Sequence, residues 1–189
     1  MMWLLALTAC FASDGAPADP TSDATEAAAA PSPTVEAAVQ AALRYRGAHY
    51  EWGGRNTAGN PGIDCLGLLF LAYGEATGTP WRRYAVNPSE LVTSGLLGAP
   101  VPGLDAAPRD RVDLGVLRRG DVLYFLIEGY EIPDDPLWVR TDGARFWPWH
   151  TGIYLGDGLT VHASPSAGVA EQPLEEIAFD ALFVTRLGG

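Results

Sequence analysis

Apolar residues repeat at helical spacing in two stretches of the chain. Residues 35–43 carry Val, Ala or Leu every three or four positions, which predicts an amphipathic helix. Ser32-Pro33 precedes this stretch as a polar cap and an early proline, and Gly47 marks its end. Residues 65–75 repeat the pattern and predict a second, more apolar helix.

The segments between and after these helices follow the helical period less well. Residues 48–63 are rich in Gly and Asn, which predicts a loop. Asn87-Pro88 is predicted to open a short helix that runs through Leu97. Residues 98–113 hold three prolines and no clear period, so no regular element is predicted there.

Strand patterns come late in the chain. Residues 121–127 form a short apolar run typical of a buried strand. Residues 151–155 and 159–163 flank a Gly-Asp-Gly sequence, which predicts a β-hairpin, and residues 179–187 predict a last strand. Because the helices precede the strands, the chain is predicted to have an α+β fold.

The first residues differ in character from the rest. Residues 1–9 form a short apolar run that ends in small residues, as in a secretory signal peptide. Leu7-Thr8-Ala9-Cys10 resembles the lipobox of bacterial lipoproteins, which implies that Cys10 becomes the lipidated first residue. No Lys or Arg precedes the run, so an ordinary signal peptide with a chance cysteine is the alternative. Residues 10–33 are predicted to be the lipidated cysteine and a disordered tether, and residues 34–189 one folded domain.

The composition excludes one class of partner. The chain has 189 residues, a net charge of −11 and no lysine, so its twelve basic residues are all arginines. Binding to nucleic acid requires a basic surface, so no nucleic-acid partner is expected. The hydrophobic fraction of 48% is ordinary for a globular protein.

The two cysteines are predicted to have unrelated roles. A Cys10–Cys65 disulfide is the alternative, but Cys10 lies in a segment predicted to be processed. Cys65 follows a glycine-rich loop and opens an apolar helix, with Asp64 as its expected cap. The helix dipole is expected to lower the pKa of such a thiol. Taken alone, an isolated cysteine before an apolar helix is more often an inert core residue.

A cysteine nucleophile needs a histidine as base and a third group that orients the base. The chain has three histidines: His49, His150 and His162. Rim or core positions without a catalytic role are the simpler interpretation of His150 and His162. A zinc site formed by these two and Cys65 is less favoured because no Cys-x-x-Cys or His-x-x-x-His spacing supports it.

Whether the two hairpin histidines meet depends on the turn between them. If residues 156–158 form a three-residue loop, His162 lies opposite Gly152 and His150 opposite Ser164. Both histidines then share one face of the sheet. A two-residue turn would place them on opposite faces. The catalytic interpretation therefore requires the three-residue loop, with its last glycine in the left-handed conformation.

Three segments of the chain, which include Cys65, His150 and His162, resemble the NlpC/P60 family of papain-like cysteine peptidases. Their order and the spacing of the two histidines are similar to those of the family. The segments are Tyr50-Glu51-Trp52-Gly53-Gly54 with Asp64-Cys65-Leu66-Gly67-Leu68, then Leu117-Arg118-Arg119-Gly120-Asp121-Val122-Leu123-Tyr124-Phe125, then His150-Thr151-Gly152-Ile153-Tyr154-Leu155-Gly156-Asp157-Gly158 with Val161-His162-Ala163.

The resemblance implies a fold and a set of roles. The fold would be a papain-like core with N-terminal helices packed on an antiparallel sheet. Cys65 would be the nucleophile, His150 the general base and His162 the orienting third member. Tyr50 and Asp64 would lie at the substrate-binding side of the site. The substrates would be the stem peptides of bacterial peptidoglycan, cut commonly between D-glutamate and a diamino acid.

Two features depart from the family. Leu66 replaces the serine that usually follows the cysteine, so the substrate preference of the family does not transfer directly. Residues 76–116 and 128–149 are predicted to be long loops, and long loops without regular structure in compact domains are usually functional or disordered. The second loop is rich in aromatic residues and is expected to be a groove wall, a lid or a small satellite core.

The resemblance leaves several functions open. An amidase or acyltransferase would use the same thioester chemistry, and a non-catalytic envelope-binding lipoprotein would keep the fold. We expect an exported monomer anchored to the membrane of the cell envelope through lipid on Cys10. No metal or cofactor is expected.

Overall fold

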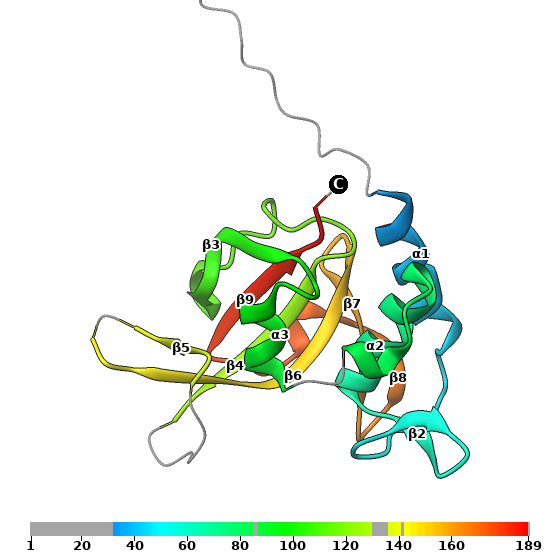
Figure 1. The fold of residues 1–189 in the computed structure, drawn as a ribbon. Helices are drawn as coiled ribbons and strands as arrows, with labels where there is room; N and C mark the ends of the chain where they lie inside the picture. The colour runs from blue at the N-terminus through cyan, green and yellow to red at the C-terminus, as the bar shows by residue number, and fades with distance from the viewer. Residues whose placement is uncertain (1–31, 85–86, 130–135, 141, 189) are drawn as a thin grey trace, which may run out of the picture.

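The structure is a computed structural model that describes residues 32–84, 87–129, 136–140 and 142–188. The predicted signal peptide, Cys10 and almost all of the predicted tether lie outside these residues. No helix within the described ranges is long and apolar enough to cross a membrane. These residues form a large antiparallel sheet with helices packed against it (Figure 1).

A seven-stranded sheet organises the molecule. Its strands follow the order β3-β9-β4-β6-β7-β8, β5 pairs with β6, and every pairing is antiparallel. The strands β6 and β7, which carry His150 and His162, are therefore neighbours inside the sheet. The strands are β3 (Ala99–Pro108), β4 (Val122–Glu128), β5 (Trp138–Val139), β6 (Arg145–Gly156), β7 (Leu159–Ser164), β8 (Gly168–Pro173) and β9 (Ala181–Arg186).

Three α-helices and a small hairpin surround one side of this sheet. The helices are α1 (Pro33–Arg44), α2 (Cys65–Thr77) and α3 (Pro88–Ser94), and side chains of Ser32, Asp64 and Asn87 cap them. The helix α2 contacts α1, β6 and β7, and Figure 1 shows α1 and α2 side by side. The hairpin consists of β1 (Arg55–Thr57) and β2 (Asn60–Ile63), and short 3₁₀ turns cover Trp81–Arg83, Arg109–Arg111 and Leu174–Glu176.

The sheet separates two apolar cores. Alternate residues of β4 point to opposite faces: Tyr124 joins the core shared with the helices, and Phe125 joins the core on the other side. The helix-side core includes Leu68 and Leu69 of α2, and the second core includes Phe179 and Leu182. Burial on both faces explains why β4 reads as a continuous apolar run.

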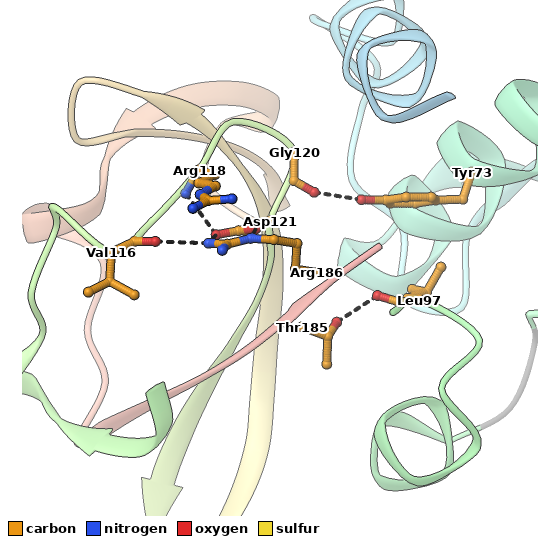
Figure 2. Close-up of polar contacts among 8 residues, drawn as sticks. All are labelled: Tyr73, Leu97, Val116, Arg118, Gly120, Asp121, Thr185 and Arg186. Atoms are coloured by element: carbon orange, nitrogen blue, oxygen red, sulfur yellow. Dashed lines mark hydrogen bonds and ion pairs between the residues drawn. The ribbon is translucent and has the colours of Figure 1, made fainter. Parts of the chain in front are cut away.

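A buried ion pair fastens the end of β9 to the start of β4 (Figure 2). Arg186 donates from Nε and Nη2 to the two carboxylate oxygens of Asp121, both at 2.7 Å, and Asp121 is 1% exposed. Beside it, the hydroxyl of Tyr73 on α2 donates to the carbonyl oxygen of Gly120 at 2.9 Å. These contacts fix the position of α2 relative to the central strands.

The structure confirms the α+β class, with the N-terminal helices packed on an antiparallel sheet. Two local predictions are wrong, and one region without a prediction contains a strand. The predicted loop 48–63 contains β1 and β2, and the unassigned region 98–113 contains β3. The third helix ends at Ser94 instead of Leu97, because Gly95 adopts a left-handed conformation and stops it.

Candidate active site

The loop before α2 is held in place through Asp64. Its Oδ1 accepts from the amide of Gly67 at 2.6 Å, which caps the helix, and from Nη1 of Arg55 at 2.6 Å. Its Oδ2 accepts from the amide of Gly53 at 2.9 Å. Asp64 is 6% exposed, so both carboxylate oxygens serve contacts within the chain. Cys65, the next residue, therefore begins α2 in a fixed position.

Cys65 is a half-buried free thiol, and Cys10, its partner in the alternative disulfide, lies outside the described residues. Burial raises the pKa of this thiol, and the charge of Asp64 raises it further. The hydroxyl and amide of Thr151 and the amide of Leu66 act in the opposite direction. The prediction of a lowered pKa at the helix N-terminus is therefore wrong for the free protein, because burial and the charge of Asp64 outweigh the hydrogen bonds from Thr151 and Leu66.

His150 and His162 form a direct pair. Nε2 of His150 lies 2.6 Å from Nδ1 of His162, and the two rings meet edge to face with centroids 4.9 Å apart. Gly152 pairs with His162 across the two strands. A Cβ atom at Gly152 would lie 2.6 Å from Cγ2 of Thr160 and 3.3 Å from Cβ of His162. Glycine at this position therefore leaves the space in which the rings approach.

The turn between the histidines differs from the predicted loop. Gly156 pairs with Leu159, so the turn contains only Asp157 and Gly158, both with positive φ. A bulge between Tyr154 and Gly156 adds one residue to β6. The bulge offsets the shorter turn, so His162 still lies opposite Gly152 as predicted.

One further pairing does not form. His150 pairs with Phe125 of β4, and the register between β6 and β7 ends at Gly152 and His162, so the predicted pair of His150 with Ser164 is wrong. The two histidines are nevertheless diagonal neighbours on one face, as the catalytic interpretation requires.

Burial keeps both histidines neutral at ordinary pH. Burial, together with a smaller effect of the neighbouring His162, lowers the pKa of His150 to about 3. Burial also lowers the pKa of His162, while the Gln172 side chain, as an acceptor for a proton of the ring, raises it. With a neutral thiol at Cys65, the resting site holds an uncharged cysteine and an uncharged base.

Aromatic side chains enclose the ring of His150. Phe125 stacks on it with ring centroids 5.6 Å apart, and Trp149 lies 5.2 Å away at an angle of 33°. Trp149 is 45% exposed, whereas Phe146 and Trp147 are buried. The described part of the aromatic-rich segment 128–149 therefore supplies both core residues and one exposed ring beside His150.

Curated relatives with related sequences are peptidases by name, although no protein-family model matches the sequence. A Mycobacterium tuberculosis protein named "Probable endopeptidase" is 34% identical over 128 residues, which are 68% of this chain and 23% of that protein. "Probable endopeptidase YafL" of Escherichia coli is 31% identical over 133 residues, which are 70% of this chain and 40% of that protein. The chain thus spans less than half the length of these relatives.

The names of these relatives agree with the peptidase family that the segments carrying Cys65, His150 and His162 resemble. The chain belongs to the NlpC/P60 family. Among solved structures, the peptidoglycan hydrolase RipB from Mycobacterium tuberculosis superposes on it with a TM-score of 0.49 at 21% identity, covering 82% of this chain and 65% of that one. No three side chains of His, Cys, Asp or Glu group as metal ligands within the described residues of this NlpC/P60 domain.

The remaining predicted residues of the NlpC/P60 site fall into different surroundings. Tyr50 is half-buried, and burial together with the charges of Cys65 and Asp64 raises its pKa, so it lies beside the nucleophile. His49 is exposed and lies 3.9 Å from Glu51, outside the histidine pair. Leu66 is half-buried and packs against the helix-side core.

Other residues at the site were not found from the sequence. Thr151 touches the nucleophile, Arg55 holds Asp64, and Gln172 acts on His162. The Oγ1 atom of Thr151 is buried and makes no hydrogen bond of good geometry in the described part of the chain. The position of Thr151 directly after His150 was the one available signal for it. Arg55 and Gln172 reach the site only through strand pairing.

Proposed function

We propose that this NlpC/P60 domain is a cysteine endopeptidase that hydrolyses peptide bonds in the stem peptides of bacterial peptidoglycan. The observation that carries the proposal is the 2.6 Å contact of His150 with His162. Cys65 begins α2 and interacts with Thr151, the residue that follows His150. The names of the curated relatives support peptide-bond hydrolysis. Membership of the family supports peptidoglycan as the substrate.

The chemistry proceeds through an acyl-enzyme. Nδ1 of His150 takes the proton of the Cys65 thiol while the sulfur attacks the carbonyl carbon of the scissile bond. The resulting imidazolium returns this proton to the leaving amine, and the acyl group remains on Cys65 as a thioester. His150 then deprotonates a water molecule that attacks the thioester carbonyl. The carbon–sulfur bond breaks, the new carboxyl group leaves, and His150 returns the proton to the sulfur of Cys65. His162 accepts the Nε2 proton of His150 throughout and holds its ring.

These steps are compatible with a site in which Cys65 and His150 are both uncharged before the substrate binds. Proton transfer creates the thiolate only when the substrate carbonyl is present to receive it. No hydrogen bond joins Cys65 to His150 among the described residues. Such catalytic contacts are often long in ligand-free enzymes and shorten when substrate binds.

The bond between D-glutamate and a diamino acid is the proposed cleavage site. Tyr50 beside Cys65 would contact the substrate on its acyl side. The carboxylate of Asp64 is bound by Arg55 and by backbone amides. Leu66 is apolar and packs against the helix-side core. Neither residue therefore offers a free polar group to the substrate, so substrate specificity rests on other residues of the site.

Digestion of purified peptidoglycan by the full chain tests the proposal. New termini are identified by mass spectrometry, which also separates hydrolysis from acyl transfer, because a transferred acyl group carries an amine in place of water. Cys65→Ala and His150→Ala should lose all measurable turnover, whereas His162→Asn should keep part of it because an amide oxygen can still accept from His150.

Two outcomes would contradict the proposal. A folded Cys65→Ala variant that digests peptidoglycan as fast as the unchanged chain would exclude the assigned nucleophile. A His162→Asn variant as inactive as His150→Ala, with an equal melting temperature, would exclude the assigned roles of the two histidines.

We also propose that the domain is exported and anchored. The segment Leu7-Thr8-Ala9-Cys10 supports lipidation of Cys10, and the polar composition of residues 11–33 supports a tether to the folded domain. A lipid-anchored monomer at the cell envelope would meet peptidoglycan directly.

A further inference from the structure

The short contact between the two histidines requires one proton and one lone pair. Nε2 of His150 and Nδ1 of His162 are 2.6 Å apart, so one of them donates and the other accepts. For His150 to take the thiol proton on Nδ1, its own ring proton must lie on Nε2 and point at His162. Nδ1 of His162 is then the acceptor, and a neutral His162 carries its proton on Nε2.

That second proton points into a buried region. His162 is 2% exposed, and its Nε2 atom is buried with no hydrogen bond of good geometry to the rest of the described chain. A buried N–H without an acceptor is unfavourable, so the required tautomer of His162 needs a partner at Nε2. Without one, the proton is free to move to Nδ1, where it would oppose the proton of His150.

Strand register places Gln172 at this position. On β7 and β8, His162 pairs with Ala170 and Thr160 pairs with Gln172. Gln172 is thus the diagonal neighbour of His162 on the same face, within reach of a long side chain. The half-buried Gln172 side chain also raises the pKa of His162 by hydrogen bonding.

The second polar group near Gln172 fits the same arrangement. Thr160 lies directly opposite Gln172, and its Oγ1 is fully buried and lacks a hydrogen-bond partner within the residues described. A glutamine amide has one acceptor and two donors. Its oxygen can accept from Nε2 of His162 while its nitrogen donates to Thr160.

We propose that Gln172 is a positioning residue that accepts the Nε2 proton of His162 and so holds Nδ1 of His162 as the acceptor for His150. The inference rests on the proposed function, because it assumes that His150 is the base. Gln172 touches neither the substrate nor the reacting sulfur. It acts through His162, which in turn orients His150.

The electrostatic surroundings of the pair are simple. His150 is the titratable group in contact with His162, and no carboxylate of the described residues contributes to the pKa of either ring. A change at Gln172 therefore acts on the pair without a competing charge.

Nitrogen-15 NMR of the full chain, labelled at histidine, tests the proposal directly. In the unchanged protein, His162 should carry its proton on Nε2. Gln172→Met keeps the size of the side chain and removes the acceptor, so the Nδ1 tautomer of His162 should become populated. In peptidoglycan digestion, kcat should fall roughly five- to tenfold, the size of one neutral hydrogen bond, with KM unchanged.

Two further variants separate this role from packing. Gln172→Glu restores an acceptor and should restore the Nε2 tautomer, while its charge shifts the acid limb of the pH profile to higher pH because it stabilises the imidazolium. Glu171→Gln lies on the opposite face of the same strand, where it removes an exposed ion pair with Arg46, and should change neither readout.

The results that overturn the inference are distinct from failure of the proposed function. A folded Gln172→Met variant with unchanged histidine tautomers would refute the role of Gln172, whatever its activity. Absence of turnover in the unchanged chain would refute the proposed function, and the tautomer measurement would still decide the inference.

Discussion

Two opposing effects act on the thiol of Cys65. Burial and the charge of Asp64 favour the neutral thiol, and the hydroxyl and amide of Thr151 favour the thiolate. The raised pKa shows that the first effect prevails in the free protein. Reactivity at neutral pH therefore depends on transfer of the thiol proton to His150 and on the donors that receive the developing negative charge.

We expect alkylation of Cys65 by iodoacetamide to show an apparent pKa above about 8.5, the value of a free thiol. Thr151→Val should raise it further and slow the reaction at pH 8 about tenfold, as expected for loss of one hydrogen bond to a charged group. Thr151→Ser, which keeps the hydroxyl, should react like the unchanged chain. Rates are measured by intact-protein mass in a Cys10→Ser background. An apparent pKa well below that of a free thiol would contradict this account.

Single residues with strong local signals could be predicted from the sequence. Cys65 follows a helix cap, and His150 and His162 flank a turn, so their segments indicate where they lie. Arg55 and Gln172 carry no such signal. Their contacts with the site depend on which residue of a neighbouring strand lies opposite, and single-sequence patterns do not fix that register.

At the level of elements, the helices and central strands were predictable and the edge strands were not. The caps Ser32 and Asp64 mark helix starts by short-range chemistry. β3 contains Pro100, Pro102 and Pro108, which argue against a strand in the middle of a sheet. Because β3 is an edge strand, proline is tolerated there, and its position in the sheet could not be read from the sequence.

In the β6–β7 hairpin, two differences from the predicted loop have opposite effects on the strand register. The catalytic interpretation required a three-residue loop, because the histidines had to share a face. The protein instead combines a two-residue turn at Asp157 and Gly158 with a bulge before Gly156. The relative placement of the histidines was predicted correctly although the turn was not, because the sum of turn and bulge sets the register.

Gly152→Ala should weaken both the hairpin and the site. The added methyl group would meet Cγ2 of Thr160 at 2.6 Å and Cβ of His162 at 3.3 Å, so β6 and β7 or the His162 ring must shift. Chemical denaturation should show a loss of about 1–3 kcal/mol in unfolding free energy, and turnover should fall among molecules that remain folded. Gly59→Ala, where a methyl group meets nothing within 4 Å, is the control and should be neutral. Equal stability of the two variants would contradict the close approach.

At the scale of the whole chain, Cys10 and the acidic, polar segment 11–33 predict that the protein is anchored to a membrane. Full-length protein expressed in a bacterium should partition into detergent and carry lipid on Cys10, as detected by mass spectrometry of the N-terminal peptide. Cys10→Ser should release the protein to the soluble fraction, because a lipid chain supplies the membrane affinity in this arrangement. A Cys10→Ser protein that remains equally membrane-bound would exclude lipid on Cys10 as the anchor.

The burial of the histidine pair links the site to the stability of the whole domain. His150 and His162 are 7% and 2% exposed, and they lie within the sheet rather than at its edge. The lowered pKa values of both mean that the folded protein binds protons there less readily than the unfolded chain. The arrangement that keeps the base neutral for catalysis therefore makes the fold sensitive to acid.

The sign of this sensitivity follows from linkage. An unfolded histidine titrates near pH 6.5, and folding lowers the pKa of His150 to about 3. Between these values the unfolded chain binds more protons, so stability is complete above pH 6.5 and falls as the pH decreases towards 3. Each histidine should contribute a slope of about 1.4 kcal/mol per pH unit between its two pKa values.

Urea denaturation from pH 4.5 to pH 7.5 measures this slope, with a His150→Gln, His162→Gln double variant as the reference. Carboxylates titrate in the same range, but they are common to both proteins, so the difference between the two curves isolates the histidines. The unchanged chain should lose stability more steeply than the double variant below pH 6.5, and the curves should run parallel above it. Parallel curves over the whole range would show that the two histidines are readily protonated in the folded domain, and the neutral resting pair on which the proposed proton transfer depends would not exist.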